Sequence, residues 1–429
     1  MNEWSEATVL VVSNPLFVNL AERLARDFKR VLLHVPYAGS FPTMNAGRVG
    51  YGLPGVELVD DVFGDHFSEV DLFVFPDLGH GALQVQLESM GKRVWGSRNG
   101  EEIELYREVC KKLMESEELP VQPWKMLKGM KALRAHLAAH ADQHVKINRW
   151  RGVTESFFSP SLEVVASKLD EIAHTLGAFQ EVLEFIVEDD LPDRVEAGID
   201  CYCIDGQYPT QTLAGIEVKD LGYVGQMVAW KAIPEPLRRW NETMAPYFAT
   251  YGYRGFLSNE IRIGEDKVPY MIDATCRAPC PPSELWQELY TNLAEILWKG
   301  ADGELVDPVP AGKWGVEIML KSEWAKNNWQ PVLYPEKYAK QIKLFNGVLL
   351  DGVRYVVTQS EDMAEIGAVV GWGDTLAAAM EHAKEAGEAI EGYGIKFNMG
   401  PIDTATEQID ELKKLGVSPF TLDKAPAKP

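Results

Sequence analysis

Alternating strand-like and helix-like segments in the first hundred residues constrain the fold more strongly than any other feature of this sequence. Helix-like segments at 16–28 and 82–90 separate apolar, β-branched runs at residues 9–12, 30–35, 71–75 and 94–95. Such alternation predicts a mainly parallel sheet with helices packed on its faces. We therefore expect an α/β domain over residues 1–100, with ligand-binding loops after the C-terminal ends of its strands.

One of these loops, Pro76-Asp77-Leu78-Gly79-His80-Gly81, lies between the strand-like segment 71–75 and a helix. Exposed backbone amides at the start of a helix bind anions well, so this loop is a candidate anion site. A glycine turn without any ligand explains the same residues equally well. The sequence alone leaves both interpretations open.

Length and charge restrict the class of protein. A chain of 429 residues is long enough for about three domains. Its formal net charge of −22 disfavours non-specific binding to nucleic acid or anionic lipid. We expect no membrane span, because the sequence has no run of about 18 apolar residues. We also expect no secretory signal, because no basic segment precedes an apolar one at the N-terminus.

The cysteines bear on the cellular compartment and on metal binding. They are Cys110, Cys201, Cys203, Cys276 and Cys280. An odd number of cysteines without a secretory signal fits free thiols in a reducing cytoplasm, so we expect a cytoplasmic protein. Cys276 and Cys280 suggest half of a zinc site, but no second pair or nearby histidine completes it. Free thiols are the favoured interpretation.

The most informative segment for chemistry is a predicted hairpin with an acidic residue on each strand. Residues 255–263 and 268–274 have the pattern of two strands joined by a short turn. Pairing around this turn places Glu260 and Asp273 on the same side, where two carboxylates would suit Mg²⁺, which shares its coordination shell with phosphates. Arg277 would stabilise charge on a transferring phosphoryl group. An ordinary acidic surface hairpin is the alternative.

Further motifs surround this hairpin in a definite order. They are Lys146 with residues 148–152 (NRWRG), then 183–186 (LEFI), 195–200 (VEAGID) and 217–222 (EVKDLG), preceded by 71–77 and 94–97 and followed by 367–371 and 373–379. In this order the chain resembles the ATP-grasp superfamily and, more closely, the glycinamide ribonucleotide synthetase (phosphoribosylamine–glycine ligase) family. The resemblance covers most of the chain and rests on order and spacing together.

The resemblance implies an ATP site whose residues come from several segments. It assigns the phosphates of ATP to Lys146 and Arg107, the adenine to a hinge running from Glu184 to Ile186, the ribose to Glu196, and a place near the nucleotide on a central strand to Lys219. Each of these side chains also has a simpler interpretation as a solvated or structural residue.

The same resemblance implies a metal site and a catalytic arginine. Mg²⁺, or Mn²⁺ in its place, would be bound by Glu260 and Asp273. Thr275 stands where the family has an asparagine, and its hydroxyl is a poorer metal ligand. Arg277 would act catalytically by stabilising an acyl phosphate. The expected cofactors are therefore ATP and a divalent metal ion.

Departures from the family pattern bear on the substrate. Residues 148–152 replace the glycine-rich phosphate loop, Leu183 replaces a hinge glutamate, and residues 278–281 (APCP) replace an acidic stretch. The N-terminal glycine-rich loop, which belongs to substrate recognition in the family, is replaced by residues 11–16 (VVSNPL). We therefore expect substrates that differ from phosphoribosylamine and glycine.

The expected fold class is α/β and α+β, an ATP-grasp fold with an N-terminal parallel-sheet domain and a C-terminal α+β domain. The expected divisions are a pre-grasp domain at 1–100, a connecting helix at 101–118, a small lobe at 119–182, a large lobe with the metal site at 183–306, a C-terminal domain at 307–422 and a disordered tail at 423–429.

The expected function is the ATP-dependent joining of a small-molecule carboxylate to an amine through an acyl phosphate. Two alternatives stay open. A kinase-like enzyme would stop at phosphoryl transfer and would need no second, nucleophilic substrate. A non-catalytic binding protein would explain the departures at Leu183, Thr275 and the phosphate loop. Retention of Lys146, the carboxylate pair and Arg277 together favours an enzyme.

Overall fold

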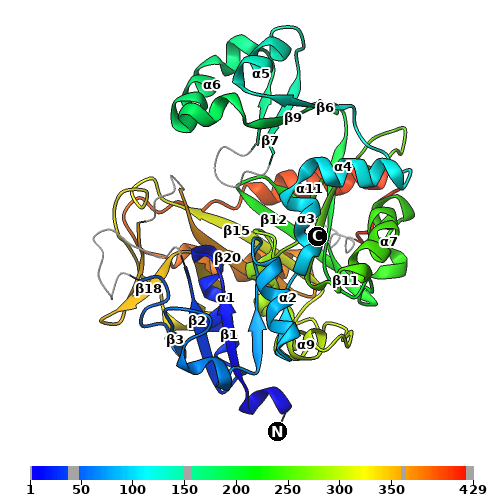
Figure 1. The fold of residues 1–429 in the computed structure, drawn as a ribbon. Coiled ribbons are helices and arrows are strands. Elements are labelled where there is room, and N and C mark those ends of the chain that lie inside the picture. Colours follow the sequence, from blue (N-terminus) through cyan, green and yellow to red (C-terminus); the bar gives the residue numbers. More distant parts are fainter. Residues whose placement is uncertain (1, 37–47, 149–155, 359–363, 422–429) are drawn as a thin grey trace, which may run out of the picture.

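A computed structural model describes residues 2–36, 48–148, 156–358 and 364–421. The fold has an N-terminal parallel sheet, a small lobe that stands apart at one end, and a large antiparallel sheet (Figure 1). The expected combination of α/β and α+β architecture is confirmed. None of the described helices combines the length and the apolar character needed to cross a membrane. Residues 149–152 of the replaced phosphate loop and the tail at 423–429 lie outside the described residues.

The N-terminal sheet has five parallel strands in the order β3-β2-β1-β4-β5. Its elements are β1 (Thr8–Val12), β2 (Arg30–His34), β3 (Val56–Leu58), β4 (Leu72–Val74) and β5 (Arg93–Trp95), with helices α1 (Val18–Leu24) and α2 (Gly81–Ser89). The three inner strands form continuous apolar runs because both of their faces are covered. β1 pairs with both β2 and β4, so the loops after β1 and β4 meet at a topological switch point, where ligands commonly bind.

The connecting helix expected at 101–118 is broken into α3 (Glu102–Leu105) and α4 (Arg107–Ser116). The break lies at Tyr106, whose φ of −118° and ψ of 85° are not helical. α4 runs beneath the small lobe (Figure 1). Arg107 and Lys111 are four residues apart, so α4 presents both on one face.

The small lobe has its own sheet and its own core. Its antiparallel strands follow the order β6-β9-β7-β8 and are β6 (Trp124–Lys128), β7 (Gln143–Ile147), β8 (Ser156–Ser159) and β9 (Glu184–Asp189), with helices α5 (Met130–Leu137) and α6 (Leu162–Leu176). β9 pairs with both β6 and β7. The lobe therefore ends after β9, and the boundary expected at residue 182 is too early.

The large sheet has eight antiparallel strands in the order β14-β13-β10-β11-β12-β15-β20-β17. They are β10 (Val195–Ile204), β11 (Gln211–Val218), β12 (Gly222–Ala229), β13 (Arg254–Ile263), β14 (Tyr270–Thr275), β15 (Trp314–Lys321), β17 (Ile342–Leu344) and β20 (Glu365–Gly373). β15, β17 and β20 come from the segment expected to form a separate C-terminal domain at 307–422. The pairing of β12 with β15 continues one sheet across the boundary expected at residue 306.

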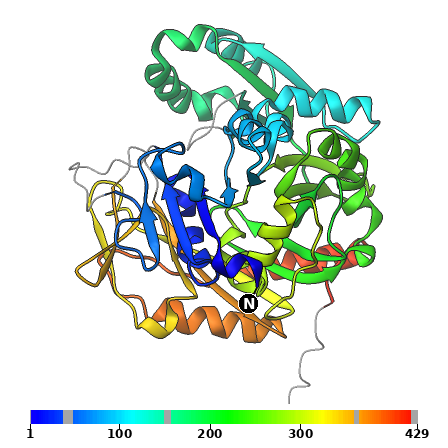
Figure 2. The ribbon, with the colours of Figure 1, turned by 60° about the horizontal axis from the view of Figure 1, so that its bottom comes forward.

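The two faces of the large sheet are covered differently. One face is apolar and packs against α7 (Glu235–Thr250), α10 (Leu376–Glu388) and α11 (Pro401–Lys414). The other packs partly against α8 (Ser283–Leu289), α9 (Leu293–Ala301) and the N-terminal sheet, which Figure 2 shows in blue. A three-stranded sheet of β16 (Gln330–Val332), β18 (Gly347–Leu350) and β19 (Val353–Val356) completes the fold. The second face is not fully covered, and the candidate site lies there.

Candidate active site

A row of glycines crosses the large sheet, and its first two members line the candidate site. Gly198, Gly215, Gly225 and Gly315 stand in register across β10, β11, β12 and β15. Tyr223 lies over the two middle glycines, and a Cβ atom on Gly215 would be only 1.8 Å from the tyrosine hydroxyl. Gly198 is not covered in this way, and it lines a cavity of about 180 Å³. The absence of a side chain at Gly198 leaves room for a ligand at this end of the row.

Acidic side chains dominate the cavity. Its charged and hydroxyl-bearing lining residues are Glu196, Asp200, Glu217, Lys219, Asp220, Tyr223, Ser258, Glu260, Asp273, Thr275 and Arg277. Six of these are acidic and two are basic. A cavity with this balance favours cations, or anions that arrive with a metal ion.

The two acids of the predicted hairpin face each other in this cavity. Glu260 on β13 and Asp273 on β14 are directly opposed in the strand register. Directly opposed residues project from the same face of a sheet, so both carboxylates point into the cavity. Thr275, two residues beyond Asp273, lies on the same face and also lines the cavity.

The carboxylates destabilise one another in the absence of a cation. Burial raises the pKa of Glu260 well above its usual value, and Glu217, Glu196 and Asp273 raise it further. Burial also raises the pKa of Glu217 to about 8. Within the described residues no group of three or more His, Cys, Asp or Glu is arranged as a ready metal site. A cation at the Glu260–Asp273 pair would complete its shell with phosphate and water oxygens, as Mg²⁺ commonly does.

Lys146 brings a positive charge to the opposite side of this site. Its Nζ donates a hydrogen bond to the main-chain oxygen of Ile272 on β14 at 2.8 Å and lies 3.4 Å from the Glu188 carboxylate. Burial alone would lower the pKa of Lys146, but Glu188 and Asp273 raise it above its usual value. The lysine therefore stays charged where the small lobe meets the large sheet.

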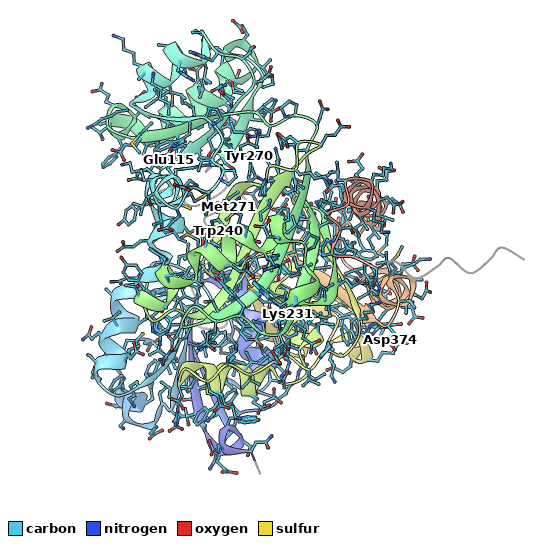
Figure 3. The ribbon with its side chains drawn as sticks, turned by 90° about the vertical axis from the view of Figure 1, so that its right-hand side faces the viewer. Glu115, Lys231, Trp240, Tyr270, Met271 and Asp374 are labelled. Carbon is cyan, nitrogen blue, oxygen red and sulfur yellow. The ribbon has the colours of Figure 1, made fainter. Side chains whose placement is uncertain are left out.

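α4 adds two further cations at this junction. The Nη1 of Arg107 donates a hydrogen bond to the main-chain oxygen of Ile147 at 3.0 Å, and the Nζ of Lys111 lies 2.5 Å from Glu188. Met271, on β14, lines the same small cavity as both cations, and Figure 3 shows it beneath the small lobe. Lys111 and Glu188 were not among the residues singled out from the sequence. The available signal was the helical spacing of Arg107 and Lys111.

Residues 184–186, the expected adenine hinge, lie on β9 in the small lobe. Glu184 begins β9 and accepts a hydrogen bond from Asn148 at 3.0 Å. Ile186 is buried in the middle of β9, opposite Lys146, so its side chain still faces the junction. The chain crosses to the large sheet only at residues 190–194, after β9. Strand pairing keeps the whole of β9 in the small lobe.

Glu196 and Lys219 both line the cavity, but Lys219 is not on a strand. Glu196 forms an ion pair with Arg262, its cross-strand neighbour, at 2.9 Å. Lys219 was expected on a central strand, yet β11 ends at Val218 and Lys219 lies exposed in the following turn. The next residue, Asp220, has the positive φ of 60° that this tight turn requires. Lys219 therefore stands at the rim of the cavity.

Arg277 is fixed where three parts of the fold meet. Its Nε lies 3.1 Å from Glu104 on α3 and 3.8 Å from Asp77, which follows β4 of the N-terminal sheet. Glu104 also accepts a hydrogen bond from the main-chain N–H of Cys276. The guanidinium is thereby held at the edge of the cavity.

The two glycine amides of the loop at 76–81 are already engaged within the chain. The main-chain N–H groups of Gly79 and Gly81 donate to the Glu101 carboxylate at 3.2 and 3.0 Å. Ser97 adds a hydroxyl donor at 2.9 Å. The carboxylate of the chain itself occupies these donors, so the glycine turn is the supported interpretation.

Comparison with known proteins gives matches in structure but not in sequence. No protein-family model and no curated protein matches the chain. A phosphoribosylamine–glycine ligase from Thermotoga maritima matches with a TM-score of 0.70 and 15% identity, over 91% of this chain and 99% of that one. The biotin carboxylase domain of a 2-oxoglutarate carboxylase from Hydrogenobacter thermophilus, in complex with MgADP, ADP and bicarbonate, matches with a TM-score of 0.66 and 13% identity, over 97% and 99%.

A third solved structure extends this set. The N5-carboxyaminoimidazole ribonucleotide synthetase from Thermus thermophilus matches with a TM-score of 0.58 and 12% identity, over 89% of this chain and 98% of that one. At these identities the likeness is one of fold. It extends over almost the whole chain.

Proposed function

Because the chain has the ATP-grasp fold that these neighbours share, we propose that it is an ATP-dependent ligase that joins a carboxylate to an amine through an acyl phosphate. The opposed pair of Glu260 and Asp273 carries this proposal. Asp273 lines both the acidic cavity and a smaller cavity lined by Lys146 and Arg107. A nucleoside triphosphate with its metal ion needs such a junction, because basic groups bind the phosphates and acidic groups bind the metal ion.

The residues at the junction fit a nucleotide with a divalent cation. Lys146 and Arg107 would hold the phosphates from the side of the small lobe, and Glu196 would accept hydrogen bonds from the ribose. Glu260 and Asp273 would bind Mg²⁺ or Mn²⁺, with the Thr275 hydroxyl beside them. The metal ion would neutralise phosphate charge and orient the transferring phosphoryl group.

Arg277 would act on the substrate side of the carboxylate pair. In the proposed reaction a substrate carboxylate oxygen attacks the γ-phosphorus of ATP and ADP leaves. An amine then attacks the acyl carbon, the C–N bond forms, and the C–O bond to phosphate breaks. The Arg277 guanidinium, held by Glu104, is placed to stabilise the negative charge of the acyl phosphate. The chain contributes positioning and charge stabilisation to both steps.

An ADP-release screen tests the proposal. The purified chain is incubated with Mg·ATP and a panel of carboxylates, each with and without hydroxylamine or a primary amine. A ligase gives ADP together with a hydroxamate or amide. Phosphorylated product formed without any amine would support the kinase-like alternative, and no ADP with any pair would support the binding-protein alternative.

Nucleotide binding is expected to stabilise the folded chain. Mg·ATP at about 100 times its dissociation constant should add roughly 2.7 kcal/mol to the free energy of unfolding. Differential scanning fluorimetry measures this as a rise in melting temperature. The variant Lys146→Met should show a smaller rise, because the phosphates lose a buried cation. The absence of any shift with millimolar Mg·ATP would contradict the proposed nucleotide site.

The chain is not expected to act as a phosphoribosylamine–glycine ligase. After β1 it carries Asn14, whose side chain bonds to Asp77 and to the main-chain N–H of Leu16, in place of a glycine-rich loop. Expression in a bacterial strain lacking that ligase should therefore not restore growth without purines. The missing gene itself, expressed from the same vector, is the control. Robust growth with this chain would show that the loop can be replaced.

Arg277→Lys is expected to reduce turnover at least about tenfold. The substitution replaces a planar guanidinium, whose donors can bind two oxygens at once, with a single ammonium group that cannot reproduce this arrangement at the acyl phosphate. Mg·ATP binding, measured by thermal shift, should change little. Arg93→Lys is a matched control, because Arg93 is also ion-paired, to Asp302, and does not line the cavity. An equal loss of nucleotide binding and turnover in Arg277→Lys would place the arginine at ATP instead.

A further inference from the structure

The register of the large sheet arranges residues that line the cavity, together with Arg262 beside them, in three rows across the strands. The first row holds Arg262 and Glu196, the second holds Asp273, Glu260 and Gly198, and the third holds Thr275, Ser258 and Asp200. Adjacent rows are separated by two residues, about 7 Å along a strand. Arg277 follows Thr275 on the chain. The third row therefore lies on the Arg277 side of the proposed metal pair, where the acyl group would be attacked.

Asp200 is a fixed, buried carboxylate in this third row. It is 3% exposed and lines the cavity. Ser258 donates its hydroxyl hydrogen to Oδ1 at 2.6 Å, and Tyr223 donates its hydroxyl hydrogen to Oδ2. Tyr223 can reach Asp200 only because Gly215 leaves the space between them empty. Four strands thus cooperate to hold one carboxylate, which has no part in binding the nucleotide as proposed above.

Asp200 is not paired with an opposite charge in the described part of the chain. The titratable groups around it include Tyr223 on β12, Glu217 on β11 and Tyr290 after α8, and the two basic residues of the same cavity are Lys219 and Arg277. Arg277 is engaged by Glu104 and Asp77, and Asp200 forms no ion pair within the described part of the chain. Burial raises the pKa of Asp200 to about 6, against the lowering effect of its two hydroxyl donors. At neutral pH it is mostly ionised and can accept a proton.

We propose that Asp200 binds the attacking nucleophile as an ammonium ion and takes its proton, so that the second substrate is a small amine without a phosphate group. This inference rests on the proposed ligase function. The proton moves from R–NH₃⁺ to the Asp200 carboxylate, and the freed lone pair attacks the acyl carbon. The C–N bond forms, the C–O bond to phosphorus breaks, inorganic phosphate leaves, and Asp200 releases its proton to water. An amine bearing a phosphate dianion would instead meet the acidic lining of the cavity.

Calorimetry on the full chain saturated with Mg·ADP tests the charge preference directly. The probes are 1,2-diaminoethane, an ammonium ion at neutral pH, and phosphoethanolamine, an amine with a phosphate group. The diamine should bind at least about tenfold more tightly. Asp200→Asn should weaken the diamine at least about tenfold, the loss expected for one charge-assisted contact, without weakening Mg·ADP. Equal or tighter binding of phosphoethanolamine overturns the inference, as does unchanged diamine binding by the asparagine variant.

A second variant tests the titration of Asp200 without removing it. Diamine binding should weaken as the pH falls through the pKa of Asp200. Tyr223→Phe removes a hydrogen bond that lowers this pKa, so the midpoint should move to higher pH. Tyr208→Phe is the matched control, because Tyr208 also donates a buried hydrogen bond, to the Asn241 main chain at 2.8 Å, outside the cavity. An unmoved midpoint in Tyr223→Phe overturns the role of Asp200. Failure of the unaltered chain to bind Mg·ADP would instead refute the proposed function.

Discussion

Asp273→Asn is expected to reduce turnover by about a thousandfold while leaving the fold intact. The substitution keeps the shape of the side chain but removes half of the negative charge that would hold the metal ion beside Glu260. Metal-ion stabilisation of a phosphoryl transfer contributes several kcal/mol, and about 1.4 kcal/mol corresponds to each tenfold change in rate. The melting temperature should change little, because the substitution removes both the repulsion between Asp273 and Glu260 and the attraction between Asp273 and Lys146.

The matched control lies on the same hairpin. Asp266 is in the turn between β13 and β14, pairs with Arg194 at 2.5 Å and does not line the cavity. Asp266→Asn should therefore keep normal turnover. Steady-state kinetics over a range of Mg²⁺ concentrations separates the variants, because only Asp273→Asn should need more metal for half-maximal rate. Normal turnover in Asp273→Asn would remove the main support for the catalytic proposal.

The N-terminal sheet could be predicted from the sequence because its information is local. Buried parallel strands are continuous apolar runs, and β1, β2 and β4 coincide closely with the runs that were recognised. β3 was missed, since Val56–Leu58 is short and carries Glu57 at its centre. That carboxylate pairs with Arg30 on β2 at 2.8 Å, a contact that no local pattern reveals.

The division into lobes could not be predicted to the same degree, because sheet membership depends on distant pairing. The sequence predicts that β9 begins the large lobe. In the structure β9 instead lies between β6 and β7 in the sheet of the small lobe. β15 follows the helices α8 and α9 and a linker, yet it pairs with β12. The resemblance to the ATP-grasp fold supplied the correct overall architecture, and the structure corrects the boundaries at 182 and 306.

The candidate site shows the same limit. Glu260 and Asp273 could be placed together from the sequence because a tight hairpin fixes their register through a few intervening residues. Asp200 could not, because its position depends on the pairing of β10 with β13 and on a tyrosine two strands away. Lys219 was expected on a strand because nothing in the sequence indicates that β11 ends at Val218, the residue before it.

Glu188→Gln is expected to lower the stability of the small lobe by about 3 kcal/mol. Glu188 is 1% exposed and lies between two lysines, 2.5 Å from Lys111 and 3.4 Å from Lys146. Removing its charge leaves two buried ammonium groups near each other, and breaking a buried ion pair by removing one partner costs about 3–5 kcal/mol. The lower end applies because Lys146 keeps its hydrogen bond to Ile272. Hydrogen exchange of the β7 and β9 amides measures the change.

The pH dependence distinguishes this charge effect from a loss of packing. Burial alone would raise the pKa of Glu188, but Lys146 and Lys111 lower it below the usual value. The stability that Glu188 contributes is therefore complete above about pH 4.3, the pKa of an unfolded glutamate, and is lost as the pH falls towards the lower folded value. The difference between the unaltered chain and Glu188→Gln should shrink over that window. Glu184→Gln, on the same strand but only half-buried, should cost less than about 1 kcal/mol. A deficit in Glu188→Gln that persists unchanged at low pH would assign the effect to packing and not to the ion pairs.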